Sequence, residues 1–159
     1  MPRYNLDMDT LIIIGAKYLA FVVAFLAIAA TLLSQKRIRN NIVKLAILSF
    51  AIAFLLAFIG EHFFFDSRPF VVEHVKPLIP HQPDNGFPSD HALAAMVAAA
   101  AVFVYHRKVG VLLGILAILV GVSRVMARVH YPVDIVGSFA FATFAVYISW
   151  IVLRRINRE

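Results

Sequence analysis

Three short polar motifs interrupt an otherwise apolar chain, and they carry residue types that can bind and transfer a phosphate. They are Arg68-Pro69 in HFFFDSRPF, Pro88-Ser89-Asp90-His91 in GFPSDHALAAM, and Ser123, Arg124, His130 and Asp134 in SRVMARVHYPVD. Arginine presents a planar fork of donors that matches phosphate oxygens and stays charged at any working pH. Histidine can attack phosphorus or protonate a leaving oxygen, and a carboxylate can orient the ring. The motifs therefore indicate phosphate chemistry.

The local setting of two motifs supports this interpretation. Ser89 and Asp90 are favoured N-cap residues for a helix that begins directly after them. Pro132 suits the first turn of another helix, two residues after His130. Helix starts offer free backbone N–H groups and a positive dipole end, which attract phosphate. Asp134 follows His130 by four residues and can accept its second ring N–H. One histidine could then attack phosphorus while the other protonates the leaving group.

Each motif also has a purely structural interpretation. Ser89-Asp90 alone is most simply a helix cap, and the arginines could hold their charges at the headgroup level. The joint occurrence of the motifs, in one order and on one face, favours chemistry. The other histidines of this face are expected to be polar loop residues: His62, His74 and His81. With no dense carboxylate cluster and no cysteine, we expect no metal site and no cofactor.

The elements that position these motifs are apolar segments long enough for a membrane. Hydrophobic residues make up 62% of the 159, charged residues 15%, and mean hydropathy is +0.84; soluble domains are about 45–50% apolar and about 25% charged. Five spans are predicted, at 10–33, 42–60, 91–105, 109–122 and 132–153. We therefore predict an all-α integral-membrane bundle, with residues 1–159 as a single domain. The N-terminus lacks the basic start of a signal peptide, so the first span is expected to be retained.

The basic residues predict the topology. With five spans, the connections 34–41 and 106–108 and the C-terminal tail share one side, and they hold eight of the 15 basic residues. The positive-inside tendency makes this side cytoplasmic, including the C-terminus. The other side receives eight of the nine acidic residues, five of the six histidines and all three motifs. An active site there would face away from the cytoplasm. Because the +6 net charge lies in short clusters between spans, no nucleic-acid partner is expected.

Together the three motifs resemble the signature of the type 2 phosphatidic acid phosphatase superfamily. That signature reads lysine, six residues, Arg-Pro; then Pro-Ser-Gly-His; then Ser-Arg, five residues, His, three residues, Asp. The third part is complete here, from Ser123 to Asp134. The resemblance covers 61–134 by motif and the remainder by helical layout. It implies a phosphatase that works without a metal on a lipid phosphate or diphosphate held in the bilayer.

The resemblance also implies a role for each matched residue. His130 would be the nucleophile that forms a phosphohistidine, Asp134 its orienting partner, and His91 the general acid. The phosphoryl oxygens, and the charge that develops on them, would be held by the remaining matched residues and nearby backbone amides. These residues are Arg68, Ser89 and Arg124.

Two positions depart from the signature. Glu61 stands where the lysine belongs and Asp90 where the glycine belongs; both are kept as candidate substrate-binding residues. A carboxylate at 61 repels phosphate, so either Arg128 and the motif arginines share the lysine's work or Glu61 pairs with a nearby arginine. The PSDH sequence after Phe87 is similar to bacterial members that act on undecaprenyl diphosphate. The family's usual six helices imply that its N-terminal helix is absent here or reduced to residues 1–9.

The substrate remains open at this stage. The resemblance favours undecaprenyl diphosphate, whose dephosphorylation recycles the lipid carrier of cell-wall synthesis at the plasma membrane. Phosphatidylglycerol phosphate and phosphatidate are alternatives with the same chemistry. A small transporter or a non-catalytic membrane protein is the alternative from another class, although charged residues cluster at the interface rather than mid-span. Self-association is open, and so is whether residues 61–87 cover the site.

Overall fold

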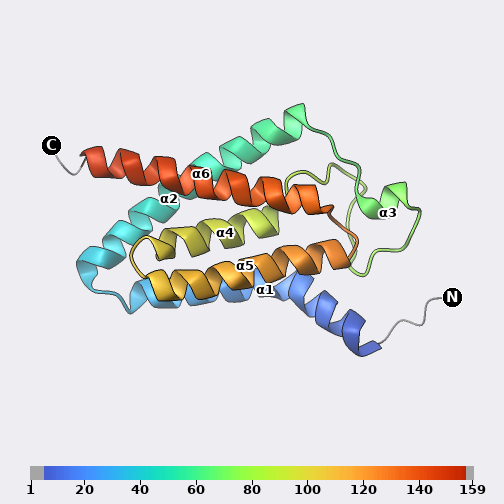
Figure 1. Ribbon diagram of the computed structural model, residues 1–159, viewed down its shortest axis with the longest axis horizontal. Coiled ribbons are helices and arrows are strands. Elements are labelled where there is room, and N and C mark those ends of the chain that lie inside the picture. The colour runs from blue at the N-terminus through green and yellow to red at the C-terminus, as the bar shows by residue number, and fades with distance from the viewer. Residues whose placement is uncertain (1–5, 157–159) are drawn as a thin grey trace.

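The computed structural model describes residues 6–156, which form six helices (Figure 1). They are α1 (Leu6–Leu32), α2 (Lys36–Phe63), α3 (Pro69–Val72), α4 (Asp90–Phe103), α5 (Arg107–Met126) and α6 (Pro132–Ile156). The predicted all-α membrane bundle is confirmed. Helix α2 begins six residues before the predicted span, because the polar residues ahead of it continue as helix. Of the segment 1–9, residues 1–5 lie outside the described residues and 6–9 form the first turn of α1.

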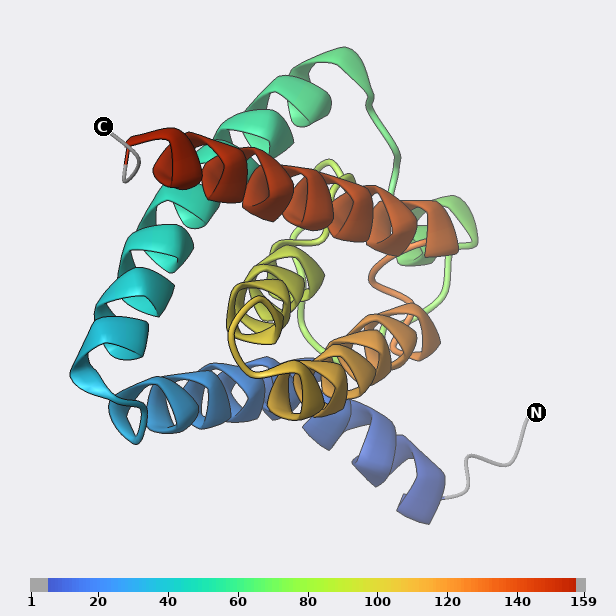
Figure 2. The ribbon, with the colours of Figure 1, turned by 60° about the vertical axis from the view of Figure 1, so that its left-hand side comes forward.

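Four of these helices are long and apolar enough to cross a membrane: α1, α2, α5 and α6. Helix α4 has only 14 residues, fewer than the roughly 20 that a full crossing needs. It contacts all four long helices, and Figure 2 shows it enclosed by them. Its alanine-rich surface lets the surrounding backbones approach closely, as is usual where membrane helices pack. The short third span is thus the centre of the bundle.

The helix ends divide the molecule into two ends of opposite character. At the first, called the motif end, α1, α4 and α6 begin and α2 and α5 finish, and the chain segment 64–89 lies across them (Figure 1). All acidic residues within 6–156 belong to this end. The second, called the basic end, holds the α1–α2 and α4–α5 connections and the last turn of α6.

The segment 73–89 folds over the motif end. The N–H of Leu78 donates to the carbonyl of Ala127 at 3.1 Å, and Ile79 is buried in an apolar cluster that includes Ile12 of α1. These contacts place the segment on the ends of α1 and α5. Gly86 and His81 of the same segment contact His130 and Arg124.

Phe87, directly before the second motif, packs between the membrane helices α2 and α6. Its ring is edge-on to Phe64 and Phe141, at centroid separations of 4.9 and 5.9 Å. Gly60 of α2 and Gly137 of α6 lie against the same ring, and a Cβ at position 137 would overlap it. Glycine at these positions lets the ring fit between the helices.

We expect Gly137→Ala to lower thermal stability in detergent, because the new methyl group must displace Phe87. Overpacking of this kind costs about 1–3 kcal/mol. Gly114→Ala in α5 is the matched control, since a Cβ there meets nothing within 4 Å and alanine favours helix by about 1 kcal/mol over glycine. Equal melting temperatures for the two variants would contradict the close fit of Phe87.

Candidate active site

The turn between α5 and α6 brings the residues of the third motif together. Helix α5 ends in a Schellman motif: the N–H of Arg128 donates to the carbonyl of Val125 at 2.9 Å, and that of Val129 to the carbonyl of Arg124 at 3.3 Å. Arg128 takes the left-handed conformation that this turn requires, with φ 62°. The chain reverses within a few residues, so Arg124 at the end of α5 faces His130 just before α6.

His130 is held through its Nδ1 atom by two acceptors. Nδ1 lies 2.9 Å from the carbonyl oxygen of Gly86 and 3.3 Å from Oδ2 of Asp134. The same Oδ2 accepts the N–H of Tyr131 at 2.8 Å. Because both neighbours of Nδ1 are acceptors, Nδ1 carries the proton and Nε2 keeps its lone pair. The spacing predicted the Asp134 contact; the closer one to Gly86 was not foreseen.

The lone pair on Nε2 faces two buried arginines. Nη2 of Arg124 lies 3.1 Å away and Nη1 of Arg68 3.4 Å away. The side chain of His130 is 2% exposed, and the two arginines are 4% and 6% exposed. Burial lowers the pKa of His130 most; Asp134 opposes this, and the two guanidinium charges lower it further. The ring is therefore neutral, with an unprotonated nitrogen beside two fixed positive charges.

Arg68 is fixed by contacts that the sequence did not indicate. Its Nε donates to Oδ1 of Asp84 at 2.6 Å, Nη1 to the carbonyl of Val129 at 2.8 Å, and Nη2 to that of Asn85 at 3.0 Å. Burial acts to raise the pKa of Asp84, but the hydrogen bond and charge of Arg68 bring it below its usual value. Four contacts, counting His130, leave the guanidinium little freedom.

Asn85 connects the first motif to the second. Its Oδ1 accepts the N–H groups of Asp66 and Phe87 at 2.9 and 3.0 Å, and its Nδ2 donates to the carbonyls of Glu61 and Phe64 at 3.1 and 3.0 Å. Every hydrogen-bonding position of the amide is used. The end of α2 is thereby fixed to the loop that carries the second motif.

Comparison with known proteins now bears on this arrangement. Residues 42–158 match the PAP2 superfamily. The chain belongs to the PAP2 superfamily. The undecaprenyl-diphosphatase BcrC of Bacillus subtilis (strain 168) is 32% identical over 142 residues, which cover 89% of this chain and 73% of that protein. A Bacillus licheniformis relative named bacitracin transport permease protein BcrC is 32% identical over 82% of this chain and 66% of its own length.

A solved structure supports the assignment. The crystal structure of Aquifex aeolicus LpxE superposes with a TM-score of 0.74 at 26% identity, over 94% of this chain and 88% of that one. The chain is therefore a PAP2-type phosphatase, a hydrolase, built as a multi-pass membrane protein.

Ser89, from the second PAP2 motif, is at the N-cap of α4 but does not act as a side-chain cap. Its N–H donates to Oγ of Ser138 at 2.9 Å, so this particular amide is already occupied. Its own Oγ is buried, and no partner for it is found among the described residues. A plain capping role therefore does not explain the hydroxyl.

His91 lies half-buried in the first turn of α4, with its ring edge-on to Phe21 of α1 at 6.4 Å between centroids. It interacts electrostatically with Arg124 and His130. The second PAP2 histidine is therefore at the same end of the bundle as the first.

The two departures from the PAP2 signature lie beside Arg68. Glu61 and Asp90, both exposed, line an open pocket of about 300 Å³ together with Arg68 and Asp84. Within residues 6–156, Arg68 forms its ion pair with Asp84, and none is found for Glu61. The suggestion that Glu61 pairs with an arginine is therefore wrong in this structure, because Asp84 occupies that role.

His81 contributes to the site, although the sequence suggested only a polar loop residue. Its Nε2 lies 3.0 Å from Nη2 of Arg124, and its ring is edge-on to His130 at 6.0 Å between centroids. Since an arginine only donates, Nε2 of His81 must accept. Burial, followed by the charges of Arg68 and Arg124, lowers the pKa of His81 to about 4.

The lowered pKa predicts how stability depends on pH. Between pH 6.5 and about 4, the unfolded chain protonates His81 while the folded one does not. Since the unfolded state then binds more protons, stability falls as the pH is lowered through this window. We expect His81→Gln to flatten the decline in melting temperature relative to the parent protein. An unchanged pH profile would contradict a neutral, arginine-bound His81.

Proposed function

We propose that this PAP2 phosphatase converts undecaprenyl diphosphate to undecaprenyl phosphate and inorganic phosphate through a phosphohistidine at His130. The observation that carries the proposal is the Nε2 lone pair of His130, neutral and buried, facing Arg68 and Arg124 at 3.4 and 3.1 Å. A nucleophile with two fixed cations beside it suits attack on an anionic phosphoryl group. The name of the Bacillus subtilis relative supports the substrate.

The first step would transfer the terminal phosphoryl group. Its oxygens take up the free donors of Arg68, Arg124 and the Ser89 hydroxyl, and Nε2 of His130 attacks phosphorus. A P–N bond forms as the P–O bond to the leaving lipid phosphate breaks, and His91 donates a proton to the leaving oxygen. Asp134, together with the carbonyl of Gly86, stabilises the charge that develops on the imidazole.

The second step would hydrolyse the phosphohistidine. His91, now without its proton, accepts one from a water molecule whose oxygen attacks phosphorus. The P–N bond breaks, inorganic phosphate leaves, and both histidines return to their starting states. His130 thus acts through a bond and His91 through a proton, and no step requires a metal.

The carboxylates beside Arg68 would direct the phosphate within the site. Glu61, Asp84 and Asp90 lie on the 300 Å³ pocket, where their negative charge disfavours a phosphoryl group. On the side of Arg68 that faces His130, Asp134 is hydrogen-bonded to the histidine, and Asp66 interacts with Asp134. We propose that Glu61 and Asp90 act in substrate binding by this repulsion, so that the family's lysine is not required.

The charge distribution supports an extracytoplasmic site in the plasma membrane, with the basic end and the C-terminus in the cytoplasm. A polyprenyl chain would then lie among the outward-facing apolar side chains of the helices, with its diphosphate at the motif end. The same chemistry could serve phosphatidylglycerol phosphate or phosphatidate. Transport is the alternative suggested by the Bacillus licheniformis name, but the buried charges gather at one end rather than along a path.

The test is phosphate release by the purified protein in detergent with excess EDTA. Undecaprenyl diphosphate, phosphatidylglycerol phosphate and phosphatidate are compared as substrates. We expect metal-independent release with the highest kcat/KM for the diphosphate. A higher value for either phospholipid would reassign the substrate, and loss of activity with EDTA would contradict the mechanism.

A further inference from the structure

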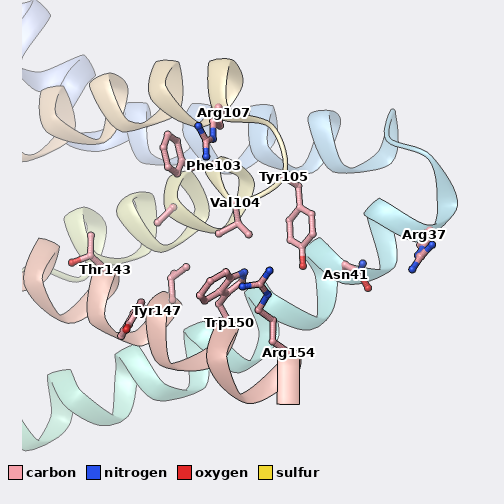
Figure 3. Close-up of a pocket in the computed structure, with 12 residues that line it drawn as sticks. Arg37, Asn41, Phe103, Val104, Tyr105, Arg107, Thr143, Tyr147, Trp150 and Arg154 are labelled. Carbon is pink, nitrogen blue, oxygen red and sulfur yellow. The ribbon is translucent and has the colours of Figure 1, made fainter. Parts of the chain in front are cut away.

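A second large pocket lies at the basic end, opposite to His91 and His130. It has a volume of about 910 Å³, near the top of the range of about 300–1,000 Å³ that ligand pockets span. Figure 3 shows the start of α2, the end of α4, the start of α5 and the last turns of α6 around it. Three arginines, Arg37, Arg107 and Arg154, line it together with Tyr105 and Trp150. None of these residues takes part in the phosphatase site.

The positive charge of this pocket has no acidic partner among residues 6–156. No carboxylate of residues 6–156 lies at the basic end, and the first turns of α2 and α5 contain no acidic residue. Arg37 and Arg107 stand in those first turns, where the positive end of the helix dipole repels a cation. Arg154 is held 4.2 Å over the ring of Trp150. Within residues 6–156 these charges are uncompensated, an arrangement that favours the binding of an anion.

The length of the pocket along α6 distinguishes a lipid from a free ion. Its lining on α6 runs from Thr143 to Arg154, and these eleven steps correspond to about 16 Å of helix. The arginines are at the outer end of this length, whereas Ala100, Thr143 and Val146 lie towards the middle of the bundle. A charged mouth with an apolar interior suits a headgroup that continues into acyl chains.

We propose that this pocket binds an anionic phospholipid, with its phosphate at the Arg154 end, in the positive field of Arg37 and Arg107, and its first acyl carbons against α4 and α6. Basic pockets between membrane helices on the cytoplasmic side are suited to anionic headgroups. Trp150 and Tyr105 supply the amphipathic rings common at the headgroup level. The site is independent of the proposed phosphatase reaction and does not rest on it.

Trp150 makes the proposal directly testable, because it is the chain's one tryptophan and it lines the pocket. The protein is reconstituted in phosphatidylcholine vesicles that contain increasing fractions of phosphatidylglycerol with brominated chains. Quenching of Trp150 fluorescence then reports lipid in this pocket, and brominated phosphatidylcholine gives the reference. We expect phosphatidylglycerol to bind about tenfold more strongly than phosphatidylcholine. Equal quenching curves for the two lipids would overturn the proposal without any variant.

A matched pair of variants separates the pocket from general surface attraction. Arg37→Gln with Arg107→Gln removes two pocket charges and leaves Trp150 and Arg154 unchanged. Lys36→Gln with Lys108→Gln removes two charges from the same helix turns but from residues outside the pocket lining. We expect the Arg37/Arg107 double variant to bind phosphatidylglycerol no more than about twofold more strongly than phosphatidylcholine. The Lys36/Lys108 double variant should retain most of the preference for phosphatidylglycerol. Equal losses would overturn the proposal, and the single variants serve if a double variant does not fold.

Inorganic phosphate is the probe for a free ion. Excess phosphate, compared with chloride at equal ionic strength, should leave the preference for phosphatidylglycerol unchanged. If phosphate abolishes it while chloride does not, the pocket binds the free ion and the lipid assignment is wrong.

Discussion

His130→Ala is expected to abolish phosphate release, lowering turnover by roughly four orders of magnitude or more. The variant removes Nε2 of His130, which lies within 3.4 Å of both Arg68 and Arg124. Among the described side chains His81 also offers a lone pair to Arg124, but it is not found in hydrogen-bond contact with Arg68. The assay is release of phosphate from undecaprenyl diphosphate in detergent with excess EDTA. After an acid-free quench, the parent protein should carry an acid-labile phosphate that the variant lacks.

His62→Ala is the matched control for this result. His62 is an exposed histidine in the last turn of α2, and we expect its replacement to leave turnover near that of the parent. If His130→Ala retained a tenth of the activity or more, the nucleophile would have to be sought elsewhere at the motif end.

Arg124→Lys is expected to lower kcat about 10²–10³-fold. Losses of this size are typical when a hydrogen-bond donor to the charge that develops in the transition state is removed. The guanidinium reaches three groups at once: the carbonyl of Ala16 at 3.4 Å, His81 at 3.0 Å and His130 at 3.1 Å. A lysine has one nitrogen and cannot span these positions. Because the contacts position the cation for transfer, the loss should fall mainly on kcat rather than on KM.

Arg128→Lys makes the same chemical change four residues further on. The Arg128 backbone completes the Schellman turn, and its side chain is not among those found in contact with His130. We expect activity within about twofold of the parent, since surface substitutions away from such contacts have small effects. Equal losses in both variants would mean that overall charge at this end, rather than the placement of Arg124, supports the reaction.

The third motif could be predicted from the sequence because its geometry is local. Arg124, His130 and Asp134 lie within eleven residues, and the turn between two helices brings them together. The four-residue step from His130 to Asp134 carries the acceptor to the ring. The long apolar helices were equally predictable, since composition alone requires them to lie in a membrane.

The contacts that complete the site could not be predicted in the same way. Gly86 acts through a backbone carbonyl, which no residue type indicates, and it lies 44 residues from His130. Asp84 and Asn85 meet Arg68 from 16 and 17 residues away, across a loop whose path is not periodic. His81 is indistinguishable by type from His74, yet one packs on His130 and the other is exposed.

The sequence by itself therefore determined the membrane bundle, the division of charge between its ends, and the residues of the third motif that meet around His130. These properties follow from hydropathy, from side-chain chemistry and from short spacings. The relevant spacings are the four residues from His130 to Asp134 and the tight turn between α5 and α6. The tertiary structure alone decided which carbonyl fixes the His130 tautomer, which carboxylate pairs with Arg68, and which histidine holds Arg124. Those choices depend on how segments 64–89 and 123–134 meet across the bundle, and packing between distant segments leaves no periodic trace in the chain.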